Sequence, residues 1–274
     1  MAISYSQLRL YKLCPRQYEY ASIKKLPRGI NVYESFGSSV HNALKRWGEL
    51  EVEATRIRNP ESGIRNLGNG QLGMFEEKQE VDSRLSSVDC LLDLWHQSFI
   101  INTYENRVEA DFHRKRGEEV MRKFYEWWSA SSREVVAVEK SFKIDVSGVE
   151  VSGRIDRIER FGIRNPESGI RVVDFKTSPP KTQEQVDSDL QLSIYAMAVQ
   201  ELYGEPCSEL ILLFLNEEGV EEVVTQRNEG QLKDAAKQIQ MLSEGIGSGE
   251  FRPTPSAGVC KRCPYKGVCD VAAV

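Results

Sequence analysis

Two carboxylates and a lysine lie close together near the middle of the chain. Asp174 and Lys176 are two residues apart in the stretch RVVDFKT, and Asp156 lies in the earlier stretch SGRIDRIER. Residues two apart in a β-strand face the same side, so Asp174 and Lys176 point together. If the two stretches pair as antiparallel strands, Asp156 can lie beside Asp174. Two carboxylates suit a hard divalent cation such as Mg²⁺, and a neighbouring lysine can orient or deprotonate a water.

An Asp-x-Lys tripeptide alone is a weak signal, because a surface ion pair at a strand edge gives the same pattern. The apolar neighbours Val172, Val173 and Phe175 change this interpretation. They predict a buried strand, in which an unpaired charge is costly. A shared site therefore explains the charged residues better than a solvated surface does.

Further polar groups lie on predicted helices. Gln191 and Tyr195 are four residues apart and hence on one helical face. The ordinary alternative is an amphipathic helix whose tyrosine belongs to the core. His41 lies on an earlier helix, where a lone histidine is more often structural or exposed, although neutral imidazole is also a suitable metal ligand.

Three of the six cysteines, Cys260, Cys263 and Cys269, lie within ten residues near the end of the chain. Three thiols are one short of a tetrahedral metal or cluster site. The sequence has no signal-peptide pattern and no apolar run of the roughly 20 residues that span a membrane. We therefore expect a cytoplasmic protein without membrane contact, in which metal or cluster ligation is a better use of cysteines than disulfides.

Composition and charge indicate a globular protein, with 274 residues, 40% of them hydrophobic, and a net charge of −5. The acidic balance argues against a general nucleic-acid binder. The first thirty residues, however, carry six basic side chains against Glu19 alone. A solvated surface is the common explanation of such charges, and phosphate binding is the functional one. The candidates for phosphate contact are Arg16, Lys24, Lys25 and Arg28.

The predicted elements alternate in a mixed α/β order. By hydrophobic periodicity we expect helices at 5–23, 35–50 and across 79–130, strands at 134–146, 149–160 and 171–177, a helix at 184–204, strands at 208–216 and 220–226, and a helix at 229–249. Ser38 or Ser39 is the expected N-cap of the second helix. We expect one domain, 1–274, with a mainly helical part (about 1–130), a core (about 131–250) and a cysteine tail (about 251–274).

The nine residues IRNPESGIR occur twice, at 57–65 and 163–171. Asn-Pro and Ser-Gly are turn signals, and two copies so far apart cannot stack as a solenoid. We expect both copies to form inserted surface loops, at 57–66 and 163–171, because extra loop length costs little free energy.

Taken together, four stretches resemble the PD-(D/E)XK nuclease superfamily: FGSSVHNAL, GRIDRIE, VVDFKTS and QLSIYAMA. The similarity runs from about Ser4 to Asp270 and is nearest to the RecB-family and AddB C-terminal nucleases, with the iron–sulfur CRISPR-associated nucleases close by. It implies a restriction-endonuclease-like fold, with a mixed central sheet flanked by helices, an N-terminal helical region and a cysteine-stapled C-terminus. The chain departs from the superfamily's name at Ile155, in place of proline, and at Asp174, in place of glutamate, as this branch often does.

The resemblance implies roles for individual residues. Asp156 and Asp174 correspond to the metal-binding carboxylates and Lys176 to the catalytic lysine. Gln191 and Tyr195 correspond to the polar pair on the following helix. The further metal ligands that it implies are His41, the backbone carbonyl of Phe175, and Glu139.

The resemblance also supplies a fourth thiol, because Cys14 joins Cys260, Cys263 and Cys269 around a [4Fe–4S] cluster in this branch. Four thiolates suit Zn²⁺ as well. Zinc ribbons use two local pairs, whereas this arrangement is one plus three, so the spacing favours the cluster. A link between residues 14 and 260 closes a very long loop and is expected to staple the two ends of the chain.

The expected function is Mg²⁺- or Mn²⁺-dependent hydrolysis of DNA, by an exonuclease that acts on single strands or DNA ends in repair, recombination or CRISPR adaptation. The sequence contains no Gly-x-x-x-x-Gly-Lys-[Ser/Thr] motif. A separate helicase or a CRISPR-adaptation protein is therefore the expected partner. The alternatives are a non-catalytic iron–sulfur DNA-binding module, an accessory subunit of a helicase–nuclease, and a zinc-stapled structural protein.

Overall fold

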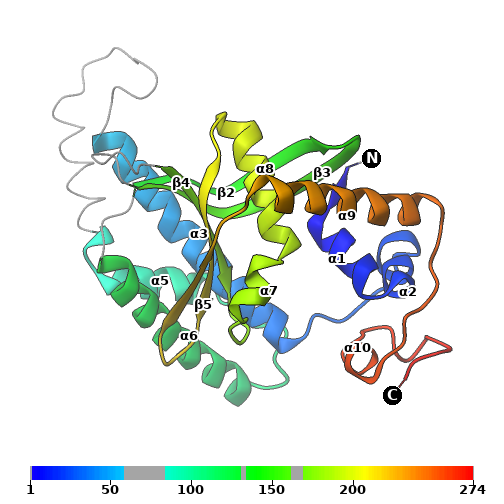
Figure 1. Ribbon diagram of the computed structural model, residues 1–274. Coiled ribbons are helices and arrows are strands. Elements are labelled where there is room, and N and C mark those ends of the chain that lie inside the picture. The colour runs from blue at the N-terminus through cyan, green and yellow to red at the C-terminus, as the bar shows by residue number, and fades with distance from the viewer. Residues whose placement is uncertain (1, 59–83, 131–133, 162–168, 274) are drawn as a thin grey trace, which may run out of the picture.

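The sheet at the centre of the molecule mixes parallel and antiparallel strands (Figure 1). The computed structural model describes residues 2–58, 84–130, 134–161 and 169–273. Within them, a six-stranded sheet has the order β1-β3-β4-β5-β6, and β2 also pairs with β3. The strands are β1 (Ile3–Ser4), β2 (Glu134–Val146), β3 (Val149–Phe161), β4 (Gly169–Lys176), β5 (Cys207–Leu215) and β6 (Val220–Thr225).

Helices cover both faces of the sheet (Figure 1). One face packs on α3 (Val32–Arg58), α5 (Val88–Ser98) and α6 (Arg107–Ser129). The other face packs on α1 (Tyr5–Leu13), α8 (Leu190–Tyr203) and α9 (Glu229–Gly247). Because β5 is buried between the two layers, its residues 210–215 are apolar throughout instead of alternating. This arrangement confirms the predicted α/β class, with a mixed sheet flanked by helices.

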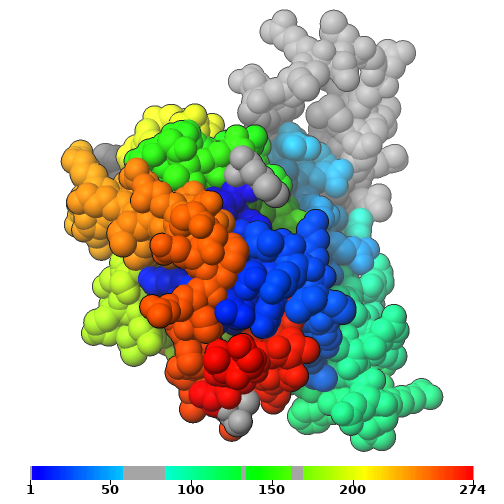
Figure 2. All heavy atoms as spheres, turned by 90° about the vertical axis from the view of Figure 1, so that its right-hand side faces the viewer, coloured from blue at the N-terminus to red at the C-terminus, as the bar shows by residue number. Residues whose placement is uncertain are grey.

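The two ends of the chain meet on one side of the molecule (Figure 2). Ser4 caps α1 through a capping box, and α1 leads into α2 (Pro15–Tyr18) and a π-helical turn (Glu19–Ile23). The tail carries α10 (Ala257–Lys261). The hydroxyl of Tyr11 donates to the carbonyl of Glu250 (2.7 Å), and the rings of Tyr20 and Tyr265 pack edge to face, with centroids 5.7 Å apart.

Two expected helix boundaries are wrong. Helix α3 begins at Val32, so Ser38 and Ser39 lie inside it and donate to backbone carbonyls one turn back (2.8 and 2.9 Å). Asn31 takes the capping role instead, since its side chain accepts from the N–H of Glu34 (2.9 Å). The helix expected at 184–204 is two helices, α7 (Gln183–Asp187) and α8.

The second IRNPESGIR copy is not a loop over its whole length. Its last three residues, 169–171, belong to β4, because Ile170 is buried in the core between β3 and β5. Ile57 and Arg58 of the first copy end α3. The remaining residues of both copies lie outside the described residues.

In the part of the chain that the structure describes, no helix combines the length and the apolar character that crossing a membrane requires.

Candidate active site

Strands β3 and β4 separate at the point where the predicted carboxylates lie. The β3–β4 pairing ends with Arg157 opposite Val173, and β1 pairs with β3 only as far along as Ser152. Asp156 and Asp174 lie one residue beyond the last β3–β4 pair, so the antiparallel register places the two carboxylates side by side, as predicted. Side chains from both helical layers reach this fork between the strands.

Asp156 has polar partners from two elements. Its Oδ2 accepts a hydrogen bond from the backbone N–H of Phe175 (3.0 Å) and lies 3.3 Å from Nδ1 of His41, which is on α3. Burial by itself raises the pKa of Asp156, but the hydrogen bond and charge of His41 outweigh it and lower this pKa below its usual value. Burial lowers the pKa of His41, and Asp156 more than reverses that effect.

Glu139 completes a group of possible metal ligands. Ligand atoms of His41, Glu139 and Asp156 all lie within 4.8 Å of one another. Glu139 has a φ of 48°, a left-handed conformation that non-glycine residues rarely adopt, and the β2–β3 register skips it. Burial and the neighbouring Asp156 raise its pKa. Backbone strain of this kind is typical of functional sites, where the surrounding structure enforces it.

Asp174 is the centre of a second polar group. Nζ of Lys176 forms an ion pair with Oδ2 of Asp174 and donates to Oε1 of Gln191 (3.1 Å). The amide of Gln191 donates in turn to the hydroxyl of Tyr195 (2.8 Å). That hydroxyl donates to the carbonyl of Arg154 (2.9 Å) and lies 3.3 Å from Oδ1 of Asp174. Apart from the ion pair, the buried Oδ2 of Asp174 has no hydrogen-bond partner among the described residues.

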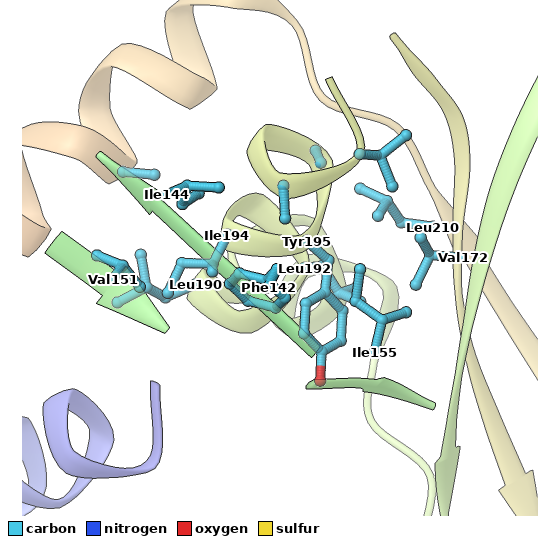
Figure 3. Packing of buried hydrophobic residues seen from close by; sticks show 14 of the residues in the cluster. Phe142, Ile144, Val151, Ile155, Val172, Leu190, Leu192, Ile194, Tyr195 and Leu210 are labelled. Carbon is cyan, nitrogen blue, oxygen red and sulfur yellow. The ribbon is translucent and has the colours of Figure 1, made fainter. Parts of the chain in front are cut away.

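Burial governs the ionisation of this second group. It raises the pKa of Asp174 to about 6, against the opposing effect of the Lys176 ammonium. Burial and the charge of Asp174 also raise the pKa of Tyr195, so its phenol stays protonated and can donate. Figure 3 shows the Tyr195 ring beside Phe142 and Ile155, with its hydroxyl oxygen at the edge of the apolar cluster. Tyr195 is thus a core residue with a polar end that reaches the site.

Asp156 and Glu139 open into a cleft of about 600 Å³. Six of the residues that line it are His41, Glu139, Asp156, Arg154, Arg28 and Lys45. Arg154 pairs with Glu139 (2.6 Å), and its side chain is 63% exposed. Sequence reasoning missed Arg154 and Lys45. The alternation of β3 could have indicated Arg154, because Arg154 and Asp156 face the same side of that strand.

The four basic residues predicted to contact phosphate lie in different places. Arg28 lines the cleft. Arg16 lines a separate pocket near the C-terminus and pairs with Glu19 (3.2 Å). Lys24 also pairs with Glu19 (2.9 Å), and Lys25 is exposed. The structure therefore brings only Arg28 of these four to the carboxylates.

The four predicted cysteines surround that separate pocket. Cys14, between α1 and α2, lines it together with Cys260, Cys263 and Cys269, and the other two cysteines lie on α5 and β5. Burial raises the pKa of Cys14, but hydrogen bonds from backbone groups of residues 16, 17 and 254 lower it overall. Burial and the neighbouring thiols raise the pKa of Cys263. The fold thus gathers thiols from both ends of the chain.

A buried ion network, made of Glu51, Arg157, Glu159 and Arg171, joins α3 to β3 and β4. Arg157 Nη2 donates to Glu51 (2.9 Å), and its Nε donates to Glu159 (2.5 Å). Arg171 donates to the second oxygen of Glu159 (2.6 Å). Arg157 and Glu159 are 1% and 0% exposed. The network connects the helix that carries His41 to the strand that carries Asp156, and sequence reasoning missed it entirely.

Comparison with known proteins gives the family. The family model of the PD-(D/E)XK nuclease superfamily matches residues 2–270. The chain belongs to the PD-(D/E)XK nuclease superfamily. It is also 23% identical over 282 residues to the gene 69 protein of Mycobacterium phage D29. The alignment covers 98% of this chain and 96% of that protein.

Two solved structures are similar to this PD-(D/E)XK protein at a lower level. One, from Eubacterium rectale and described as a candidate exonuclease, is 11% identical, with a TM-score of 0.45 over 96% of this chain and 87% of its own. The other, SSO0001, is 15% identical, with a TM-score of 0.38 over 82% of this chain and 97% of its own. We base the assignment on the family model, which implies a hydrolytic nuclease that uses a divalent metal and acts on DNA.

Proposed function

We propose that this protein is a Mg²⁺- or Mn²⁺-dependent nuclease that degrades DNA from single strands or ends, with Asp156, Asp174 and Lys176 at its active centre. The observation that carries the proposal is the meeting of metal-type ligands and a lysine at one strand fork, where His41, Glu139 and Asp156 line an open cleft. A non-catalytic DNA-binding module would have no use for the buried Asp174–Lys176 pair, because burial of charges costs free energy.

The donor set fits a hard divalent cation. Imidazole and carboxylate groups of His41, Glu139 and Asp156 converge, and the buried carboxylate of Asp174 lies beside Asp156, with the Lys176 ammonium as the partner of its Oδ2. His41 and the three carboxylates would hold the ion, and the carbonyl of Phe175 stays a predicted further ligand. A bound Mg²⁺ or Mn²⁺ supplies Lewis-acid activation of the scissile phosphate and of a water.

Lys176 is the residue that we expect to act on the attacking water. Its ammonium is positioned by Asp174 and Gln191, and it can orient the water and offset charge that develops on the phosphate. Gln191 is fixed by the protonated hydroxyl of Tyr195, which is itself anchored on the carbonyl of Arg154. Gln191 and Tyr195 therefore act as positioning residues.

The motifs that resemble RecB-family and AddB nucleases support a narrower proposal. We propose 5′-phosphate products, a role in repair, recombination or CRISPR adaptation, and work alongside a separate helicase or adaptation protein. The alternative is an accessory, non-catalytic subunit of such an assembly.

A metal-dependent nuclease assay tests this proposal. Protein purified without oxygen is incubated with end-labelled linear single-stranded DNA and Mn²⁺. We expect degradation that EDTA abolishes and excess Mn²⁺ restores, because the carboxylates act only with the metal. Asp156→Asn protein, prepared in parallel, controls for contaminating nucleases. The DNA could instead stay intact after incubation with Mn²⁺ or Mg²⁺ and wild-type protein that retains its cysteine-bound cofactor. That result would support the non-catalytic module.

We also propose that Cys14, Cys260, Cys263 and Cys269 bind a [4Fe–4S] cluster that joins the two ends of the chain. Thiol ligands alone suit either a cluster or Zn²⁺. The grouping of one distant and three local cysteines supports the cluster. Its role would be structural, because it closes a long loop.

Cys14→Ser is expected to remove most of the bound iron and sulfide and the visible absorbance of the protein, since serine oxygen is a poor ligand for this group. Loss of the staple should lower the free energy of unfolding by about 4 kcal/mol, by analogy with other long-range cross-links. Elemental analysis and denaturant unfolding measure both effects, with Cys90→Ser as the matched control. Zinc in place of iron in the wild type would favour the zinc alternative, and undiminished metal in Cys14→Ser would exclude Cys14 as a ligand.

A further inference from the structure

An exposed aromatic ring stands at the entrance of the cleft. Tyr33, in the first turn of α3, is 77% exposed and lines the cleft that contains His41 and Asp156. Ile30, on the same rim, is 62% exposed. Among the described residues, the Tyr33 ring takes part in no aromatic or cation–π pair. A tyrosine buries a large area at little entropic cost, so this ring is suited to being covered by a bound molecule.

The Tyr33 ring and His41, one of the metal-type ligands, lie on one stripe of α3. Tyr33, Gly37 and His41 are spaced by four residues and therefore share a helix face, and the backbone rises by about 12 Å between Tyr33 and His41. Gly37 leaves the floor of the cleft between them without a side chain. A Cβ at Gly37 would approach Oγ1 of Thr177 to 3.1 Å, so α3 also packs closely on the segment that follows Lys176.

The cationic side chains of the cleft are only partly available for phosphate. Arg28, Lys45 and Arg154 line it, and each has a carboxylate partner. The partners are Glu34, Glu49 and Glu139, at 2.9, 3.8 and 2.6 Å. The whole chain is also acidic, with a net charge of −5. Phosphate attraction is therefore limited, and part of the affinity for a nucleic acid must come from non-ionic contacts.

We propose that Tyr33 stacks on a nucleobase of single-stranded DNA, a short distance along the strand from the phosphate that is cut. The inference rests on the proposed nuclease function, narrows the strand state of the substrate to single strands, and names the residue that selects it. A base within a duplex is covered on both faces by its neighbours, whereas a base in a single strand has a free face. Since every base has such a face, stacking on Tyr33 does not depend on sequence.

Binding and cleavage by Tyr33→Ala test the proposal. In Ca²⁺, which we use to measure binding apart from cleavage, we expect the Kd for a labelled oligothymidylate to rise about 5- to 100-fold, the usual effect of removing one base–aromatic stack. Tyr33→Trp should retain the affinity, because it keeps an aromatic face. Phe112→Ala is the matched control, since Phe112 is 65% exposed on α6 and does not line the cleft.

A scan with single abasic residues makes the test specific. At one position of the oligonucleotide, loss of the base should weaken binding to the wild type but leave binding to Tyr33→Ala unchanged. With Mn²⁺, Tyr33→Ala should slow cleavage of single strands much more than cleavage inside a duplex.

The outcomes separate the two proposals. The stacking would be overturned, and the nuclease function left intact, if the wild type binds and cuts DNA and Tyr33→Ala binds DNA equally well. The same conclusion would follow if the wild type and Tyr33→Ala lose the same affinity at every abasic position. If Tyr33→Ala and Tyr33→Trp lose equal affinity for both single-stranded and duplex DNA, Tyr33 has a structural role, and the stacking proposal is overturned as well. Wild type that neither binds nor cuts DNA would overturn the proposed function itself.

Discussion

Replacing Lys176 with alanine is expected to slow DNA cleavage by about 10²- to 10³-fold or more, the usual effect of removing a group that acts on the transition state. Its ammonium contacts only Asp174 and Gln191 among the described residues, so the fold should survive the change. Single-turnover cleavage of labelled single-stranded DNA measures the effect. Lys143→Ala is the matched control, because Lys143 forms an ordinary surface pair with Glu150 on the same sheet.

A second measurement separates chemistry from metal binding in Lys176→Ala. Lys176 opposes the rise that burial imposes on the pKa of Asp174, which lies at about 6 with the lysine present. Without the lysine, Asp174 should protonate more readily and bind metal more weakly. If Lys176 acts on the water, saturating Mn²⁺ will not restore the rate. Full rescue of Lys176→Ala by saturating Mn²⁺ would reduce Lys176 to an electrostatic support for Asp174. If Lys176→Ala cuts DNA at the wild-type rate without added Mn²⁺ beyond the standard amount, the active centre lies elsewhere.

Arg157→Met is expected to lower the free energy of unfolding by about 3–5 kcal/mol, because it leaves Glu51 and Glu159 buried without their shared guanidinium. The indole of Trp128 also donates to Glu51 (2.6 Å), so the loss would spread to the packing of α6 against α3. Urea unfolding measures the change. Arg154→Met on the same strand is the control, since the Arg154 side chain is 63% exposed and its pair with Glu139 should contribute about 1 kcal/mol or less.

The pH dependence of the stability of the wild type and Arg157→Met provides an independent check. Burial raises the pKa of Glu159, but Arg157 and Arg171 outweigh it and lower the pKa below the usual value. A lowered folded-state pKa contributes stability that is fully present above the ordinary glutamate pKa and is lost as the pH falls through the lowered value. The stability difference between wild type and Arg157→Met should therefore be largest near neutral pH and narrow in acid. A difference that stayed constant into acid would mean that lost packing, not charge, causes the destabilisation.

Several features of this protein follow from local sequence pattern alone. The strands at 134–146 and 149–160 and the helix at 229–249 appear close to where periodicity predicts them, because their residues alternate or repeat with the period of the element. The same periods place Asp174 with Lys176, and Gln191 with Tyr195, on common faces. Local pattern was less successful at boundaries, since it missed Asn31 as the cap of α3 and the short β1 strand.

Tertiary structure decided how these faces meet. His41 approaches Asp156 because α3 packs on the sheet, where Glu51 of α3 pairs with Arg157, a residue that strand alternation alone does not mark as buried. The left-handed backbone of Glu139 turns a strand residue toward the same site, and no local pattern announces it. Cys14 and Cys260 meet across almost the whole length of the chain. Sequence periodicity determines which residues share a face of one element, but contacts between elements depend on packing and burial summed over the entire fold, and those energies are not encoded in any single stretch.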